Sequence, residues 1–309
     1  MKPLEGIHHI TAITADSQAN LDFYAGVLGL RLVKKTVNQD NPGVYHLFYA
    51  DEKGSAGSDI TFFEYPGLPR GRAGDGMVHL ICSRVASEEA LDFWEERLDA
   101  AGVSIERGEG SLRFEDPEGL AHELVVTETD EEPLVARHPE IPPEFSLQGF
   151  DGVRAYASSP ERSADLLEGA LGFESEDAPG AWLAQGSNRS GSYRYDAPPP
   201  EPGQQGAGTV HHVAWASQLD ELDDWRRAAM GAGAQATPLI DRFYFESIYF
   251  REPSGVLFEL ATLGPGFTVD EPQESLGERL SLPPDFEHLR DQVEPTLRPL
   301  VDPRSPARG

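Results

Sequence analysis

The chain repeats one strand–helix–strand plan four times, and this repeat restricts its fold more than any other feature of the sequence. Each unit opens with a short apolar strand, passes through a polar turn into an amphipathic helix, and closes with further strands. The predicted opening strands are residues 7–13, 77–82, 152–156 and 210–215. The predicted helices are residues 19–28, 87–101, 161–171 and 219–231. Four such units predict an α+β fold, because each helix and each half-buried sheet needs a partner layer.

The repeat is visible in the letters of the sequence as well as in its periodicity. Residues 23–30 read FYAGVLGL and residues 167–173 read LEGALGF, so the first and third helices end in a similar way. Gly29 and Gly172 provide the left-handed residue with which many helices end. Equivalent positions can therefore be compared between units.

A stretch rich in proline and glutamate, residues 130–143, separates the second unit from the third. Such a composition favours a connecting segment. We therefore expect an N-terminal half at 5–129, a linker at 130–146 and a C-terminal half at 147–265. Residues 266–309 form a polar tail, for which we predict one helix near residues 285–297.

The chain is strongly acidic, with 53 acidic and 25 basic residues among 309 and a net charge of −28. Such a surface repels nucleic acid and anionic membranes, so neither is an expected partner. The acidic residues are dispersed along the chain, which favours a solvated, halophilic surface over a single acidic binding face. No apolar run reaches the roughly 20 residues of a membrane helix. Cys82 is the only cysteine, and no signal segment is apparent, so we expect a cytoplasmic protein.

Two of the units open with adjacent histidines, His8-His9 and His211-His212. Side chains alternate between the two faces of a strand, so only one histidine of each pair is expected to face the interior of a site. The second unit carries a single histidine, His79, whose match in the other units is the second of each pair. This comparison selects His9 and His212.

Glu259 lies 47 residues after His212, in the last strand of the same unit. That strand is otherwise apolar, and an unpaired buried carboxylate is costly. A lone histidine on an apolar strand is usually a hydrogen-bonded core residue, but here two occupy matched positions of one repeat. If the first and fourth units pair, then His9, His212 and Glu259 form the two-histidine, one-carboxylate set that leaves open positions on Fe(II).

Two further sets of residues could also bind a metal. Glu64, near the end of the first unit, could serve as a fourth ligand, or a register difference of one residue could turn it away. His79 and Glu123 are 44 residues apart in the second unit and could form a second site. Gly152 stands where the partner histidine of that site would be needed, which favours a site that has lost its ligands.

Residues 5–265 resemble the vicinal-oxygen-chelate, or glyoxalase–dioxygenase, superfamily, in which βαβββ modules pair into curved mixed sheets around a divalent metal. Three stretches are similar to the hydroquinone ring-cleaving dioxygenases of the 2,6-dichlorohydroquinone 1,2-dioxygenase type. They are LVKKT at 32–36, YHLFYAD at 45–51 and DRFYFESIYFREPSGVLFE at 241–259. The resemblance implies that His9, His212 and Glu259 bind Fe(II), with Mn(II) as an alternative. It also implies a small aromatic diol and O2 as substrates.

The same resemblance implies supporting roles for His211, Arg242 and Tyr249. Tyr249 lies an even ten residues before Glu259, so across a hairpin it could donate a proton or hydrogen bond to substrate. Arg242 could stabilise developing negative charge, and His211 could relay a proton. Each residue also has an alternative role without function. Tyr249 could cap a face of the sheet, Arg242 could form a surface ion pair, and His211 could be a packing residue.

Two other functions remain open at this stage. A glyoxalase-like lyase or isomerase would use a fourth protein ligand and a metal such as zinc or nickel. A ligand-binding module without catalysis is the other alternative, which an intact set of three ligands disfavours. The sequence leaves the substituents of the ring and a homo-oligomeric state open.

Overall fold

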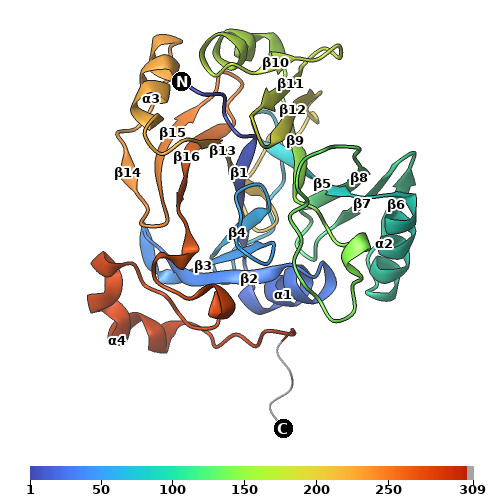
Figure 1. Ribbon diagram of the computed structural model, residues 1–309, viewed down its shortest axis with the longest axis vertical. Coiled ribbons are helices and arrows are strands. Elements are labelled where there is room, and N and C mark those ends of the chain that lie inside the picture. Colours follow the sequence, from blue (N-terminus) through green and yellow to red (C-terminus); the bar gives the residue numbers. More distant parts are fainter. Residues whose placement is uncertain (305–309) are drawn as a thin grey trace.

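The structure is a computed structural model that describes residues 1–304 and contains two eight-stranded curved sheets with few helices (Figure 1). The first sheet joins the first and fourth units in the order β14-β15-β16-β13-β1-β4-β3-β2. The second joins the second and third units in the order β10-β11-β12-β9-β5-β8-β7-β6. Both sheets contain parallel and antiparallel neighbours. The predicted α+β fold of four units paired into curved mixed sheets is therefore confirmed.

The two sheets are built from strands of two to ten residues. Those of the first sheet are β1 (Ile7–Thr14), β2 (Arg31–Asn38), β3 (Asn41–Ala50), β4 (Asp59–Glu64), β13 (Val210–Ser217), β14 (Ile240–Asp241), β15 (Phe245–Arg251) and β16 (Leu257–Pro265). Those of the second are β5 (Val78–Val85), β6 (Ile105–Gly108), β7 (Ser111–Glu115), β8 (Ala121–Val126), β9 (Phe150–Tyr156), β10 (Glu174–Ser175), β11 (Ala181–Gln185) and β12 (Ser190–Asp196).

The helices of the four units are short, and two of them differ from the prediction. They are α1 (Ser17–Leu21) continuing into η1 (Asp22–Val27), α2 (Glu88–Ala100), η3 (Pro160–Ser163) followed by η4 (Asp165–Ala170), and α3 (Leu222–Gly231). The helices predicted at 19–28 and 161–171 are present, but their second halves, η1 and η4, are π-helical. Gly26 and Gly169 lie in these π-helical turns. Within residues 1–304, no helix combines the length and apolar character needed to cross a membrane.

The antiparallel pairing of β1 with β13 joins the first unit to the fourth. Ile10 lies opposite Val213, and both are fully buried. The register shifts twice along this pair, once between Ile7 and His9 and once between Thr11 and Ala12. Each shift is a β-bulge, which turns a side chain away from regular alternation. The pairing of β1 with β13 therefore contains two bulges, one at each histidine pair.

The C-terminal tail lies along β2 and β3 (Figure 1). It contains η5 (Phe267–Val269), η6 (Gln273–Ser275), η7 (Pro284–Leu289), α4 (Arg290–Val293) and η8 (Glu294–Thr296); the remaining short turn, η2 (Pro143–Phe145), precedes β9. The stretch predicted as one helix near 285–297 is helical without a gap from 284 to 296, but it changes from 3-10 to α and back to 3-10 geometry. Pro295 lies in the last piece and has no backbone N–H to continue an α-helix.

A fully buried lysine anchors the tail to the sheet. Lys34 Nζ on β2 lies 2.7 Å from Asp270 Oδ1, contacts the Glu271 carboxylate, and donates to the Phe267 carbonyl at 3.2 Å. The ammonium also lies 4.9 Å from the centre of the Tyr244 ring. A buried ammonium requires such partners, because an unpaired charge is very costly away from water.

We predict that replacing Lys34 with methionine lowers the free energy of unfolding by about 3–5 kcal/mol, because it leaves the buried Glu271 carboxylate without its cation. Urea unfolding measures the change. Lys35→Met is the matched control, since Lys35 Nζ makes only a 3.3 Å hydrogen bond to the Glu278 carbonyl near the surface. Equal stabilities of the two variants would contradict an anchoring role for Lys34.

Candidate metal centre

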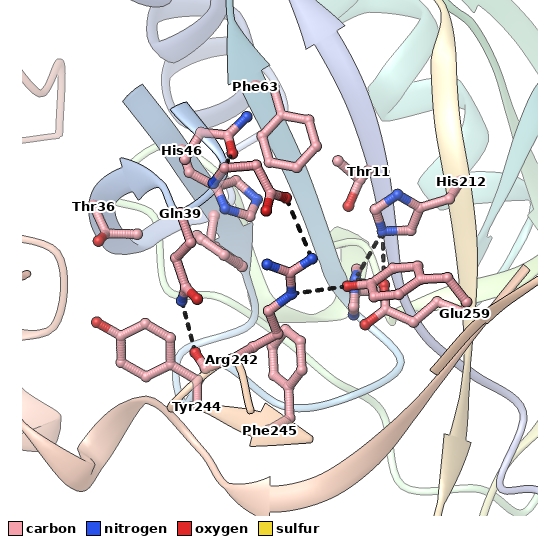
Figure 2. Close-up of a pocket in the computed structure, with 15 residues that line it drawn as sticks. Thr11, Thr36, Gln39, His46, Phe63, His212, Arg242, Tyr244, Phe245 and Glu259 are labelled. Carbon is pink, nitrogen blue, oxygen red and sulfur yellow. Dashed lines mark hydrogen bonds and ion pairs between the residues drawn. The ribbon is translucent and has the colours of Figure 1, made fainter. Parts of the chain in front are cut away.

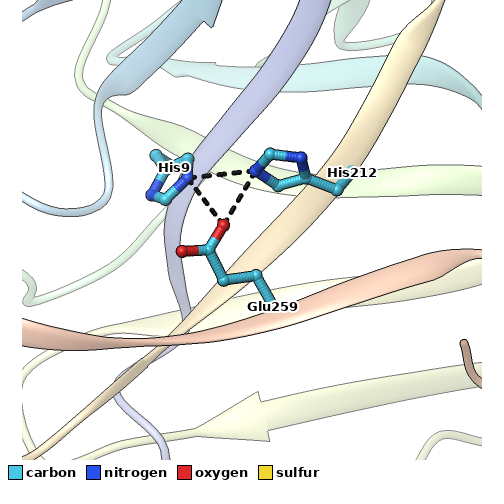
Figure 3. Close-up of side chains that lie close together, drawn as sticks. All are labelled: His9, His212 and Glu259. Carbon is cyan, nitrogen blue, oxygen red and sulfur yellow. Dashed lines mark hydrogen bonds and ion pairs between the residues drawn. The ribbon is translucent and has the colours of Figure 1, made fainter. Parts of the chain in front are cut away.

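Three predicted residues of the first sheet converge on one point, at one end of a pocket (Figure 2). His9 lies on β1, His212 on β13 and Glu259 on β16, and all three are buried. Glu259 Oε2 lies 3.2 Å from His9 Nε2 and 2.8 Å from His212 Nε2, and the two nitrogens are 3.3 Å apart (Figure 3). Within residues 1–304, this is the group of histidine, cysteine and acidic side chains whose spacing suits a metal ion.

The chemistry of these side chains fits a divalent cation. Glu259 Oε2 is buried and accepts no hydrogen bond, whereas its other oxygen accepts one from the Ser247 hydroxyl. Burial raises the pKa of Glu259, but the two imidazoles hold it well below its usual value, so it is a carboxylate. Burial lowers the pKa of His212, which favours the neutral ring. Two imidazoles and one carboxylate are a common ligand set for Fe(II) and similar metals.

Hydrogen bonds orient the His9 ring toward the centre. His8 Nε2 lies 3.1 Å from the Thr262 carbonyl, which only accepts, so this nitrogen carries a proton. Burial lowers the pKa of His8 to about 3, so the ring is neutral and its Nδ1 is an acceptor. His9 Nδ1, at 2.9 Å, must then donate to it, which leaves the lone pair of His9 Nε2 facing the centre.

His211 contacts the His212 ring at the same edge. The two Nδ1 atoms are 2.8 Å apart, and burial lowers the pKa of His211 to about 4. His8 was missed as a site residue, because simple strand alternation turns it away from its neighbour. The β-bulges at His8 and His211 remove that alternation and bring each ring to the Nδ1 edge of the next. The repeated histidine pair was the signal in the sequence.

Glu64 does not join the three residues. Its side chain accepts a hydrogen bond from the Ser17 backbone at 3.1 Å, at the start of α1. The register shows which residue holds the fourth position: Thr61 pairs with Thr11 just as Glu259 pairs with Ala214. Thr61 Oγ1 is committed to neighbouring side chains, at 3.0 Å from Thr11 Oγ1 and 2.8 Å from His46 Nε2. The position equivalent to Glu259 therefore holds a hydroxyl group and no carboxylate.

The second sheet has no equivalent set of ligands. Ile81 pairs with Val153 as Ile10 pairs with Val213, which gives Leu80 and Gly152 the positions of His9 and His212. The sequence match of His79 to the second histidine of each pair was therefore wrong by one residue. A Cβ atom at Gly152 would lie 1.9 Å from Ser192 Oγ, so a histidine does not fit there.

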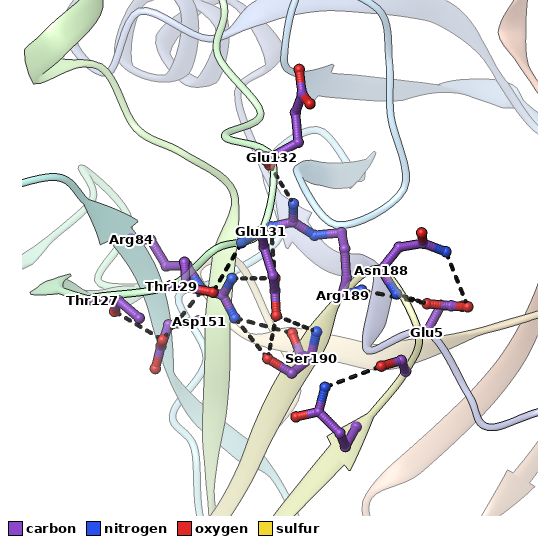
Figure 4. A network of polar contacts seen from close by, with 12 residues as sticks. Glu5, Arg84, Thr127, Thr129, Glu131, Glu132, Asp151, Asn188, Arg189 and Ser190 are labelled. Atoms are coloured by element: carbon purple, nitrogen blue, oxygen red, sulfur yellow. Dashed lines mark hydrogen bonds and ion pairs between the residues drawn. The ribbon is translucent and has the colours of Figure 1, made fainter.

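The polar residues of this second sheet pair with one another. His79 Nε2 lies 2.8 Å from Asp196, and Glu123 accepts a hydrogen bond from Arg113 at 2.7 Å. Farther along, Arg84 on β5 binds the Glu131 carboxylate, which also accepts from the Ser190 hydroxyl at 2.6 Å (Figure 4). These contacts tie the segment after β8 to β5 and β12, and they account for the charges of this sheet without a metal.

The pocket beside the three residues is lined by two of the predicted supporting residues. Tyr249 lies opposite Glu259 in the β15–β16 pair, and its ring meets the His212 ring edge-on at 5.7 Å. Arg242 Nε donates to the Tyr249 hydroxyl at 3.3 Å, and its guanidinium also pairs with Asp40 at 3.3 Å (Figure 2). Burial raises the pKa of Tyr249 above its usual value, so the phenol stays protonated and can donate. His211 supports His212 and does not line the pocket.

The enclosed cavity is about 40 Å³ and therefore small for an aromatic ring, since a cavity of about 150 Å³ accommodates benzene. Arg242 lies across it, between the three residues and the opposite wall (Figure 2). Its partner Asp40 is exposed, and exposed ion pairs are weak. Entry of a ring therefore requires the Arg242 side chain to move, and the weak pair permits this.

Several residues that line the pocket were not predicted as site residues from the sequence. Thr36 lies on β2, and His46 on β3 faces it across the strand pair. Burial lowers the pKa of His46 well below its usual value, so this ring is neutral. Phe245 packs 5.1 Å from the His9 ring. Their position depends on the pairing of β2 with β3 and on the curvature of the sheet.

Comparisons with known proteins agree with this geometry. The model of the Glyoxalase/Bleomycin resistance protein/Dioxygenase superfamily matches residues 6–124 and 149–260. A relative named "Putative ring-cleaving dioxygenase MhqO", from Bacillus subtilis (strain 168), is 45% identical over 305 residues, covering 96% of this chain and 97% of its own. The chlorohydroquinone/hydroquinone 1,2-dioxygenase of Sphingobium indicum is 32% identical over 320 residues, covering 97% of both chains.

Among solved structures, a crystal structure titled as a putative dioxygenase from Bacillus subtilis subsp. subtilis str. 168 superposes with a TM-score of 0.90. It is 41% identical and covers 99% of this chain and 100% of its own. The likeness therefore extends over the whole fold, including both sheets.

We predict that His212→Ala reduces the bound metal from about one ion per chain to nearly none, because a two-ligand site holds a divalent ion weakly. Elemental analysis after anaerobic loading with Fe(II) and dialysis measures the stoichiometry. His79→Ala is the matched control and should keep its metal, since His79 pairs with Asp196 in the other sheet. Loss of metal in His79→Ala alone would move the site to the second sheet.

Proposed function

Because the chain belongs to the Glyoxalase/Bleomycin resistance protein/Dioxygenase superfamily, we propose that it is a ring-cleaving dioxygenase. We propose that Fe(II), or alternatively Mn(II), binds to His9, His212 and Glu259. The substrates in this proposal are O2 and a small aromatic diol of the hydroquinone type. The family membership and the names of the relatives support the reaction class, and the three converging side chains support the metal.

The strongest support for this proposal is the identity of the residue at the fourth position of the site. Thr61 occupies the place equivalent to Glu259, so three protein side chains face the centre and none closes the opposite side. Oxygen chemistry on a ring requires open positions for the diol and for O2. A glyoxalase-like reaction on this site would lack the fourth protein ligand, and Glu64 does not supply it.

The residues of the pocket have distinct roles in the proposed reaction. A bound Fe(II) or Mn(II) supplies redox and Lewis-acid chemistry. Tyr249, protonated and opposite Glu259, donates a hydrogen bond or proton to an oxygen atom of the reacting substrate. Arg242 holds the Tyr249 hydroxyl in place and brings a positive charge beside the oxygens that become negative.

The aromatic side chains of the pocket keep water from the site. Phe63 lies on one side, 6.5 Å from the His212 ring, and Phe245 lies on the other side against His9. Apolar walls of this kind strengthen the interactions of the few polar groups that face the substrate. They also suit a flat aromatic ring better than a charged, flexible substrate.

We predict that Fe(II)-loaded protein consumes about one O2 per molecule of hydroquinone or methylhydroquinone, as measured with an oxygen electrode at high salt. Tyr249→Phe should lower kcat by about 10²–10⁴-fold, since a positioned proton donor typically contributes that factor. Metal content and thermal stability of this variant serve as its control. Tight zinc binding with no oxygen uptake on any aromatic diol would exclude the proposed function.

We also predict that Thr61→Glu retains metal but loses nearly all oxygen consumption, because a second carboxylate would close the open side of the centre. Thr61→Ser is the control; it keeps the hydroxyl that contacts Thr11 and His46, and should remain active. Elemental analysis and oxygen uptake are measured on both variants. Full activity of a correctly folded, metal-loaded Thr61→Glu would contradict the assignment of the open position to Thr61.

A further inference from the structure

Two buried side-chain atoms of the pocket lack a hydrogen-bond partner, and they lie at opposite ends of it. One is Glu259 Oε2, at the candidate metal centre. The other is Thr36 Oγ1, whose side chain lines the pocket although the residue is only 2% exposed. Figure 2 shows Thr36 and Tyr244 at one end and His212 and Glu259 at the other. Buried hydroxyl groups are normally paired, so an unpaired one that faces a binding pocket indicates a polar partner.

Two other polar side chains near Thr36 each have one atom engaged in a hydrogen bond. His46 Nε2 lies 2.8 Å from the Thr61 hydroxyl, and Gln39 Nε2 donates to the Arg242 carbonyl at 2.8 Å. The Tyr244 hydroxyl donates to Asp270 Oδ2 at 3.1 Å, which leaves its oxygen able to accept. At this end of the pocket the Thr36 hydroxyl is therefore the polar group that is both buried and without a hydrogen-bond partner, and the oxygen of the neighbouring Tyr244 can accept.

We propose that Thr36 and Tyr244 form a subsite for the second hydroxyl group of a para-diol, the first being held at the metal end. This inference rests on the proposed function and names the recognition element within it. In a para-diol the two oxygens project from opposite ends of the ring, as the two unpaired atoms of the pocket do. In an ortho-diol both oxygens lie at one end, so Thr36 would stay unpaired and buried. The subsite therefore selects hydroquinones over catechols.

The tail holds this subsite in position. Tyr244 is fixed by Asp270, and Asp270 is fixed by Lys34, which lies two residues before Thr36 on β2. The Lys34 ammonium also lies beneath the Tyr244 ring. Both halves of the subsite are thus attached to one buried ion-pair cluster, which keeps them together at a constant distance from the centre.

The test compares ligands that differ only in the second hydroxyl group. Dissociation constants of hydroquinone, 4-methylphenol and catechol are measured by anaerobic calorimetry on the Fe(II)-loaded full chain, so that no turnover occurs. For Thr36→Val, which keeps the shape of the side chain, we expect hydroquinone to bind about tenfold more weakly. Binding of 4-methylphenol and of catechol should change less than about twofold, since neither places a hydroxyl group against Thr36.

Two further variants control for indirect effects. Thr36→Ser keeps the hydroxyl group and should retain the preference for hydroquinone. Ser281→Ala removes another buried, unpaired hydroxyl on the tail segment that bonds to β2, outside the pocket, and should leave all three constants unchanged. If Thr36→Val does not fold, Thr36→Ala provides the same comparison, with circular dichroism as the check.

The outcomes separate the subsite from the proposed function. Equal weakening of hydroquinone and 4-methylphenol by Thr36→Val, or no weakening of either, would overturn the subsite. A wild-type protein that consumes oxygen with hydroquinone and shows this result would keep its proposed function. A wild-type protein that binds hydroquinone but never consumes oxygen would lose the proposed function, while the Thr36 comparison would still decide the subsite.

Discussion

The antiparallel pairing of β1 with β13 is the contact on which the rest of the molecule depends. It joins units that are about 200 residues apart in sequence and places His9 and His212 within 3.3 Å of each other. The same pairing contains the two bulges that bring His8 and His211 against the ligand rings. One strand pair thus supplies both histidines of the candidate centre and the hydrogen bonds that orient them.

The two sheets share one plan but differ at the positions that matter for chemistry. Where the first has His9, His212 and Glu259, the second has Leu80, Gly152 and Arg194. Its charged side chains neutralise one another, as Arg113 does with Glu123 and Arg84 with Glu131. The second sheet therefore contributes packing surface and ion pairs. The first sheet differs in holding a buried carboxylate, that of Glu259, with one oxygen that accepts no hydrogen bond.

Sequence patterns predicted the repeat and the α+β fold, because both follow from periodicity. They also named the three residues that converge, since the histidine pairs of the first and fourth units match each other, although the comparison with His79 that chose one histidine of each pair was wrong by one residue. They did not predict β2, where the buried Lys34 interrupts an apolar pattern and has partners more than 230 residues away. Without β2, Thr36 could not be assigned to the pocket. Sequence patterns also could not predict the orientation of His8. Side chains stop alternating between the two faces of β1 at a bulge, and this bulge exists only because β1 pairs with β13.

The two ends of the pocket are held in position by separate sets of contacts. The metal end depends on the seam between β1 and β13, and the distal end depends on Lys34, Asp270 and Tyr244. Effects of distant substitutions that share no partners are usually additive. Changes at Thr36 or Tyr244 should therefore alter which diols bind while leaving the affinity for metal nearly unchanged. Under the proposed function, such separation would let one centre act on differently substituted rings through changes confined to β2 and the segment before β15.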